Sequence, residues 1–238
     1  MLNLSTCATL IHSIHIKFFL KEVINNIMER KTRVPTQKRS LEKYERIIAA
    51  AFKLFNEKGY FNITTVDIAK EADVAIGSVY SYFNDKKDIY IEISKRITNN
   101  ISEPTCDFWK ENSKINFRDV EVMKNIFHSF IKMMMDNHNF SKLFHDDMTA
   151  LGLLDKDITV IREENHKKQL KRTREILISL SIPFKSKDAL DVFVHYLNLL
   201  IDDICHQILY DKTNEDIALY IDQTIEMIYK LLLNLSDI

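Results

Sequence analysis

Apolar residues between positions 41 and 58 recur every three or four residues, which is the spacing of one face of a helix. The residues on this face are Leu41, Tyr44, Ile48, Ala51, Phe52 and Phe55. Gly59 follows where a left-handed helix end is expected, and Tyr60 is placed to pack back on Phe55. The pattern predicts a supporting helix that ends at Lys58.

Two much shorter helical patterns follow, with a tight turn between them. Thr64 or Thr65 can accept a backbone N–H at the start of the first, and Asp67 supplies the acidic half of a capping box. The second begins near Ile76. Because such short helices are marginal alone, we expect inward-facing residues to hold them: Val66, Ile68, Val74, Val79 and Phe83. Two short helices around a tight turn are typical of a helix-turn-helix, and DNA is the first partner to consider.

The remainder of the chain also has the helical period. Asn84 or Asp85 can cap the next helix, with Asp88 in its first turn. Helices are expected over 86–101, 105–112, 118–137, 139–150, 156–181, 187–210 and 214–235, with Pro104, Gly152 and Pro183 as breaks. Because no strand alternation or internal repeat stands out, the expected fold class is all-α, with about nine helices.

The last two of these helices differ in pattern. The helix within 187–210 is apolar on nearly all sides, so it must be covered on two faces. The final helix carries one clean apolar stripe: Ile217, Ile221, Ile225, Ile228, Leu232 and Leu235. With 46% hydrophobic residues overall, the long C-terminal part can form a sizeable helical core.

Charge is distributed unevenly along the chain. Residues 28–96 hold 14 Lys and Arg against 10 Asp and Glu, a net charge of +4. Residues 98–238 hold 17 Lys and Arg against 23 Asp and Glu, a net charge of −6. The net charge of −1 for the whole chain therefore combines a basic N-terminal part with an acidic C-terminal part. Five cations before the first helix indicate a flexible arm that reaches DNA, or alternatively a solubilising tail: Arg30, Lys31, Arg33, Lys38 and Arg39.

From about residue 37 to about residue 97 the chain resembles the TetR family of bacterial transcriptional regulators. The matching positions are Gly59-Tyr60, Thr64-Thr65, Ile68-Ala69, Val74, Gly77, Val79-Tyr80, Tyr82-Phe83 and Lys86. Two positions depart from the family pattern. Asp73 stands where the turn usually has Gly, but Asp tolerates a left-handed backbone. Ala75 stands where Ser or Thr usually caps the recognition helix, which should cost about 1 kcal/mol.

The resemblance implies a set of DNA contacts. Four residues would face the major groove: Ile76, Gly77, Ser78 and Tyr80. Thr65, Tyr82 and Lys86 would hold phosphates, with Arg39 in the basic arm. Because the helix 76–82 has no Arg or Lys, it offers no bidentate guanine contact. Thymine-methyl contact by Ile76, hydroxyl contacts by Ser78 and Ser81, and DNA shape remain for sequence reading.

The resemblance also implies an assembly, a division into parts and a function. The helices 187–210 and 214–235 would form a four-helix interface in a homodimer, which suits a palindromic double-stranded DNA operator. The expected parts are a leader of non-native or poorly ordered residues 1–27, an arm 28–40, a helix-turn-helix domain 41–85 and a helical regulatory and dimerisation domain 86–238. The function implied is a ligand-responsive bacterial regulator, a repressor released from DNA when an effector favours wrongly spaced recognition helices.

A stripe rich in Met and Phe indicates where a small apolar or amphipathic effector would bind. The candidate contacts are Met123, Phe127, Phe130, Ile131, Met134, Phe144, Met148 and Tyr196. Ordinary core packing is the alternative interpretation of this stripe.

Other chemistry is weakly supported. The chain has no nucleophile elbow, P-loop or Cys-x-x-Cys, so neither catalysis nor a cofactor is expected. The acid and histidine residues at 145–147 and 202–206 could bind a metal, but such pairs are common on solvated helix faces and no metal site is predicted. The alternative function is a helical enzyme or small-molecule carrier that keeps the N-terminal helices only as structure. Binding of the protein to DNA from its own promoter region would distinguish a regulator from an enzyme or carrier.

Residues 1–27 match no targeting pattern. The apolar part of 10–20 is too short to span a bilayer, and the flanks are not those of a signal peptide. With three unpatterned cysteines, Cys7, Cys106 and Cys205, the expected compartment is the reducing cytoplasm, with no membrane partner. Residues 21–24 can be encoded by a ribosome-binding sequence, so Met28 is the expected start; an extra helix folding onto the body is the alternative.

A chain shortened to begin at Met28 is therefore expected to fold, dimerise and bind operator like the full chain. Thermal melting and DNA titration of the two chains check this expectation. A large fall in melting temperature on shortening would instead show that residues 1–27 pack on the body.

Overall fold

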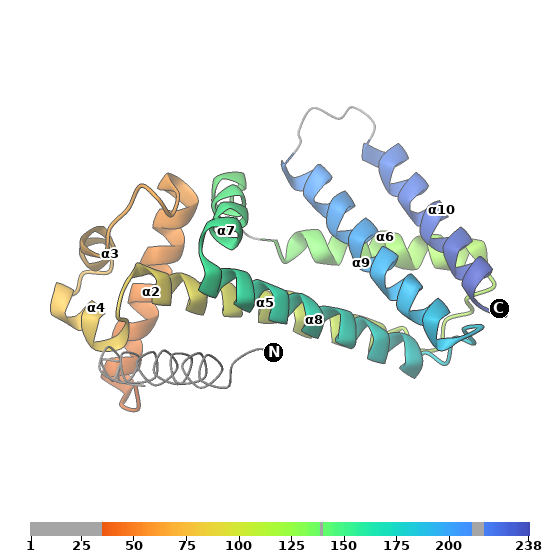
Figure 1. The fold of residues 1–238 in the computed structure, drawn as a ribbon, viewed down its shortest axis with the longest axis horizontal. Coiled ribbons are helices and arrows are strands. Elements are labelled where there is room, and N and C mark those ends of the chain that lie inside the picture. Colours follow the sequence, from red (N-terminus) through yellow and green to blue (C-terminus); the bar gives the residue numbers. More distant parts are fainter. Residues whose placement is uncertain (1–34, 139, 211–216) are drawn as a thin grey trace, which may run out of the picture. The chain divides into compact units, whose positions relative to one another are not determined.

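The computed structural model describes residues 35–138, 140–210 and 217–238. These residues form nine helices, α2 to α10, without a strand in the described ranges, and Phe184 and Ser236 form an isolated bridge (Figure 1). The predicted all-α fold is therefore confirmed. The predicted leader and the first part of the arm lie outside the described residues.

The chain divides into two compact units. The first comprises residues up to Lys53 and Ile63–Tyr90, and the second comprises Leu54–Asn62 and Ile91–Ile238. The first unit therefore contains most of the long helix α2 (Lys38–Lys58) and the two short helices α3 (Thr65–Glu71) and α4 (Ile76–Tyr82). The last turn of α2 belongs to the second unit, as does most of α5 (Lys86–Glu111).

The core of the first unit is formed by apolar faces of its helices. Ile68 and Val79, from the two short helices, are fully buried, and the ring of Phe83 stacks on Tyr44 with centroids 5.0 Å apart. The inward placement predicted for Val66 is wrong, since its side chain is 61% exposed. Val66 precedes the buried Ile68 by two residues, which puts it on the opposite side of a helix.

The start of α2 also differs from the prediction. The helix begins at Lys38, three residues before Leu41, so Arg39 lies in its first turn and is exposed. Leu41 is 47% exposed and lies outside the buried stripe, whereas Ile47, which the predicted stripe omitted, is fully buried. Part of the predicted arm is therefore helical.

The second unit is built from long helices: α6 (Val120–Asp136), α7 (Lys142–Leu154), α8 (Lys156–Ser179), α9 (Lys187–Tyr210) and α10 (Ile217–Leu235). Helix α9 packs along α10, and both contact α6, while α8 packs against α7 and α9 (Figure 1). The apolar residues between them form one core, to which α5 contributes the single tryptophan, Trp109.

The predicted break at Pro104 is wrong, because α5 continues from Lys86 to Glu111 with Pro104 inside it. Proline removes the backbone N–H that would donate to Asn100 O, and the neighbouring hydroxyls bond other carbonyls of the same helix. Thr105 donates to Ile101 O at 2.8 Å and Ser102 donates to Thr98 O at 2.7 Å. Burial of Trp109 beyond the proline favours continuing the helix into the core.

Helix α7 also differs from the predicted segment 139–150. It begins at Lys142, capped by Ser141, whose hydroxyl accepts from Phe144 N at 3.2 Å. It continues through Gly152, which was predicted to end it. A Cβ at this buried position would lie 2.7 Å from Arg162 Nη1, so the glycine lets this side chain of α8 lie close to α7 and does not mark a break.

Candidate functional site

The first candidate site is the α3–turn–α4 unit, whose local hydrogen bonds match the sequence prediction. Thr64 Oγ1 accepts from Asp67 N at 3.2 Å, and the Asp67 carboxylate accepts from Thr64 N at 2.8 Å, which is a complete capping box. The turn contains Asp73 at φ 50°, the left-handed conformation expected there. Val74 N donates to Ala69 O at 3.0 Å and closes the turn.

Helix α4 presents an open outer face. Ile76 and Tyr80 are each 38% exposed, and the space around Gly77 is empty where a Cβ would stand. Ala75 occupies the cap position without a side-chain hydrogen bond, as predicted. Ser78 is half-buried, and its carbonyl accepts from Ser81 Oγ at 2.7 Å. The residues expected to meet base edges therefore lie on a short helix that the core holds from the other side.

The predicted phosphate-holding residues lie around this helix. Thr65 Oγ1 and Tyr80 OH form a hydrogen bond at 2.9 Å, which joins α3 to α4. Lys86 Nζ donates to Ile63 O at 2.6 Å, so the ammonium group lies beside the start of α3. Tyr82 is half-buried and makes an edge contact with Tyr44, with ring centroids 5.8 Å apart. These contacts fix the orientation of the side chains before any partner binds.

The second candidate site is a cavity of about 500 Å³ inside the second unit. Such a volume is typical of sites that bind small molecules. Four predicted effector contacts from α6 line it: Met123, Phe127, Phe130 and Met134. The sequence analysis missed Trp109 of α5, Phe193 and Leu197 of α9 and the polar residues of α8. The lone tryptophan on an amphipathic helix was the available signal for α5.

Four other residues predicted to contact an effector lie elsewhere. Ile131 is buried in the core, and Phe144 stacks on Phe55 with ring centroids 5.3 Å apart. Met148 is half-buried on α7. Tyr196 is 46% exposed on α9. None of these four belongs to the cavity wall formed by the described residues.

Helix α7 is bonded to the last turn of α2 and to the residues that follow it. Ser141 donates through its backbone N–H to Asn56 Oδ1 and through Oγ to Asn56 O, the second at 2.9 Å. Tyr60 N donates to the Asp147 carboxylate. Gly59, at φ 81°, lets the chain turn here, where a Cβ would lie 2.7 Å from Asp147 Oδ2. Through these bonds α7 holds the end of the helix that supports the helix-turn-helix.

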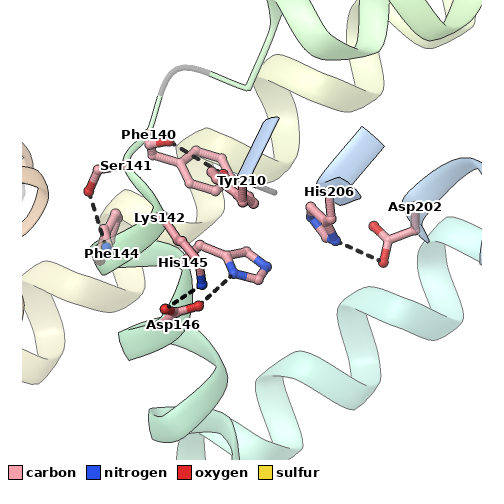
Figure 2. A network of polar contacts seen from close by, with 9 residues as sticks. All are labelled: Phe140, Ser141, Lys142, Phe144, His145, Asp146, Asp202, His206 and Tyr210. Carbon is pink, nitrogen blue, oxygen red and sulfur yellow. Dashed lines mark hydrogen bonds and ion pairs between the residues drawn. The ribbon is translucent and has the colours of Figure 1, made fainter. Parts of the chain in front are cut away.

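Aromatic and histidine rings fill the space between α7 and the end of α9 (Figure 2). His145 of α7 lies 4.5 Å from His206 and 4.8 Å from Tyr210, measured between ring centroids. His138, which follows α6 and also lines the cavity, lies 5.8 Å from His206. Tyr210 OH donates to Phe140 O at 3.3 Å. The rings thus connect the cavity wall to α7.

Carboxylates flank this ring cluster. Lys142 Nζ lies 2.9 Å from Asp146 Oδ2, and this hydrogen bond lowers the pKa of Asp146 (Figure 2). Burial lowers the pKa of His206 below its ordinary value. The charges of His145 and His138 lower it further, whereas Asp202 and Asp203 raise it. Burial also raises the pKa of Tyr210 to about 12. His206 therefore favours its neutral form in the folded protein.

The acid and histidine residues singled out in the sequence do not converge. Asp147 faces Tyr60 N, Asp146 faces Lys142, and Asp202 lies 3.6 Å from His206. In residues 35–138, 140–210 and 217–238, no group of three His, Cys, Asp or Glu is placed to hold a metal ion. Over the same ranges, no helix has the length and apolar character needed to cross a membrane.

Known proteins resemble this chain most in its first unit. Residues 47–93 match the family described as bacterial regulatory proteins, tetR family. The transcriptional regulator HbdR of Aromatoleum sp. (strain CIB) is 46% identical over 56 residues, which are 24% of this chain and 24% of that protein. The fatty acid metabolism regulator protein of Bacillus subtilis (strain 168) is 43% identical over 58 residues, 24% of this chain and 30% of that protein. The matched stretches thus span less than a third of these relatives.

The whole fold also has solved counterparts. A crystal structure assigned to a TetR-family transcriptional regulator of Mesorhizobium loti MAFF303099 aligns with a TM-score of 0.64 at 18% identity. The alignment covers 85% of this chain and 100% of the other. At this identity the likeness concerns the arrangement of helices in both units.

The lowered pKa of His206 predicts acid sensitivity. Below about pH 6.5 the unfolded chain binds more protons at this residue than the folded chain, so its contribution to stability is lost as the pH falls. We expect the melting temperature to decrease between about pH 7.5 and about pH 5.5, and His206→Gln to reduce this decrease by a few degrees. His166→Gln, at an exposed position of α8, is the control. Equal decreases in all three proteins would contradict the assignment.

Proposed function

We propose that the protein is a dimeric, ligand-responsive DNA-binding repressor of the cytoplasm, because residues 47–93 match the tetR family of bacterial regulatory proteins. The observation that carries the proposal is the helix-turn-helix with an open outer face on α4. Capping of α3 and the left-handed Asp73 set its geometry, and the buried Val79 and Phe83 leave the opposite side of α4 for DNA.

DNA recognition by α4 would rely on apolar and hydroxyl contacts. Ile76 is placed to contact a thymine methyl group, and Gly77 allows the backbone to approach the bases closely. Ser78 and Tyr80 would complete the base-facing surface, while Thr65, Tyr82, Lys86 and Arg39 would contact phosphates. Because no Arg or Lys lies on α4, much of the specificity would come from DNA shape.

Dimerisation through α9 and α10 would present two recognition helices to a palindromic operator. Both helices bury one face in the core and leave apolar residues on the other: Val192, Tyr196 and Leu199 on α9, and Leu219, Tyr220 and Met227 on α10. Exposed apolar residues concentrated on adjacent helices are typical of protein interfaces. A twofold axis through this surface would suit half-sites about one helical turn of DNA apart.

Release from DNA would begin in the cavity of the second unit. Met134 and His138 connect the cavity to the histidine cluster, and that cluster contacts α7. Helix α7 in turn bonds Asn56 and Tyr60 at the end of α2. An effector that favours another position of α7 would displace the end of α2 and change the spacing of recognition helices in a dimer. Fatty acid metabolism, named for one relative, concerns that protein, whose match is limited to the DNA-binding region.

The alternative is a helical enzyme or carrier in which the helix-turn-helix only supports the fold. Titration of the purified protein with labelled DNA from upstream of its own gene distinguishes the two. A repressor binds this DNA much more tightly than random DNA of equal length, whereas a carrier binds both weakly or equally. Sedimentation of the complex gives the number of chains bound to each operator.

Lys86→Ala tests phosphate anchoring. Loss of one phosphate contact should weaken binding to specific and random DNA alike and reduce the salt slope by about one unit. Lys86→Arg retains the charge and should largely restore both quantities. Because Lys86 also donates to Ile63 O, thermal melting of each variant is measured alongside. A loss confined to one operator sequence would mean that Lys86 reads bases.

Phe130→Trp tests the effector cavity. Phe130 lines the cavity and contacts Trp109 with ring centroids 5.3 Å apart, so a larger ring fills space that a ligand needs. We expect the apolar fluorescent probe N-phenyl-1-naphthylamine to bind about tenfold more weakly, with operator affinity within about threefold. Leu153→Trp, at a position 78% exposed, controls for the added indole. Unchanged probe binding by Phe130→Trp would exclude this cavity as the site.

A further inference from the structure

We propose that the effector is an amphipathic anion, an alkyl chain with a carboxylate head, bound lengthwise in the cavity with its head at Lys168 and Arg172. The inference rests on the proposed function and specifies the chemistry of its ligand. It is carried by the way polar and apolar residues are arranged along four helices and by two cations of α8 that line the cavity.

The cavity wall changes from polar to apolar along α5 and α6. On α5 the lining begins with Lys95, Thr98 and Asn99 and ends with Trp109. On α6 it begins with apolar Met123, and the wall ends at His138, just beyond the helix. These helices run in opposite directions in Figure 1, so their polar ends meet at one end of the cavity and their apolar ends at the other.

Helices α8 and α9 show the same change. After Ile161, the lining of α8 continues with the polar residues Glu164, Asn165 and Lys168, and it ends with Ile176, Leu177 and Leu180. The lining of α9 begins with Phe193 and ends with Asp202. Helix α8 runs in the direction of α5, while α9 runs back toward the start of α8 (Figure 1). All four helices therefore place their polar residues at the same end, so the cavity fits a ligand that is polar at one end only.

Two cations of α8 that do not line the cavity form ion pairs. Arg174 Nε lies 2.7 Å from Asp191 Oδ1, and Lys171 Nζ lies 3.8 Å from Glu175 Oε1. Lys168 and Arg172, which line the cavity, have no ion-pair partner among the described residues. Their separation of four residues puts them on one helix face. An anionic head between them would provide the missing partner, and Arg172 can bind a carboxylate through two parallel hydrogen bonds.

Two carboxylates also belong to the polar end. Asp202 faces His206, with Oδ2 lying 3.6 Å from Nδ1, and is thereby oriented toward the histidine cluster. Glu164 lies one turn before Lys168 and farther from the apolar end than either cation. A ligand whose tail fills the apolar end would therefore place its head closest to the charge of Arg172. This order along α8 favours an anion over a cation.

The available length limits the tail. From Arg172 to Leu180 the helix rises about 12 Å, at about 1.5 Å per residue. Tail burial against Trp109, Leu177 and Phe193 would supply most of the affinity, while the head would set orientation and specificity. A medium-length alkyl carboxylate such as dodecanoate has both parts.

The experiment compares three probes with the same tail: dodecanoate, dodecanol and dodecylammonium, each kept below the concentration at which it forms micelles. Binding to the full chain is measured by calorimetry at low ionic strength and near neutral pH. We expect dodecanoate to bind at least about tenfold more tightly than dodecanol, and dodecylammonium most weakly. Raising the salt concentration should weaken dodecanoate and leave dodecanol nearly unchanged.

Variants locate the head. Arg172→Gln and, separately, Lys168→Gln should reduce dodecanoate affinity about tenfold while leaving dodecanol affinity unchanged. Lys167→Gln is the matched control, because Lys167 is an exposed neighbour on α8 that does not line the cavity. Unchanged dodecanol binding also shows that each variant keeps the folded cavity.

Three results would overturn the proposal: dodecanol binding as tightly as dodecanoate, dodecylammonium binding most tightly, or equal effects of Arg172→Gln and Lys167→Gln. Absence of binding by all three probes would overturn it as well. Operator binding is titrated separately with and without dodecanoate. The expected probe order without release of DNA would support the ligand class and contradict the effector role. Failure to bind operator at all would contradict the proposed function alone.

Discussion

Helices of seven residues cannot hold their own shape in water, and both α3 and α4 have that length. The helix-turn-helix therefore depends on burial of Ile68, Val79 and Phe83 by the rest of the first unit. A side chain that is buried to hold α4 in place cannot also contact DNA. The surface of α4 left for base recognition in the proposed function is consequently small, and it consists of Ile76, Gly77 and a few hydroxyl groups.

Helix α2 belongs to both units, and in the proposed function this continuity would give an effector a mechanical route to DNA. Its main part helps form the first unit, and its last turn is bonded to α7 through Asn56. This route would run from the cavity through ring contacts and hydrogen bonds to α7 and α2. It would need no contact between an effector and the residues proposed to bind DNA. The physical requirement is that α7 has two arrangements of similar free energy that the cavity distinguishes.

Features that depend on neighbours in sequence could be predicted, and features that depend on packing between helices could not. The Thr64–Asp67 capping box and the left-handed Asp73 follow from residue types at short spacing. The helix break predicted at Pro104 was wrong because the rule that proline ends a helix ignores the burial that Trp109 gains when α5 continues. Four of the eight residues predicted to contact an effector line the cavity, and all four lie on the apolar stripe of α6, since burial along a helix is periodic. The position of Arg172 on the cavity wall depends on how α8 packs, and it could not be predicted from the sequence.

The empty space beside Gly77 makes this position unusually free to change. Alanine in its place would meet no atom within 4 Å and would favour the helix by about 1 kcal/mol. A side chain added there would alter the surface offered to the groove without disturbing the core. In the proposed repressor, operator preference would therefore be able to diverge by single substitutions at this position without a change in the rest of the fold.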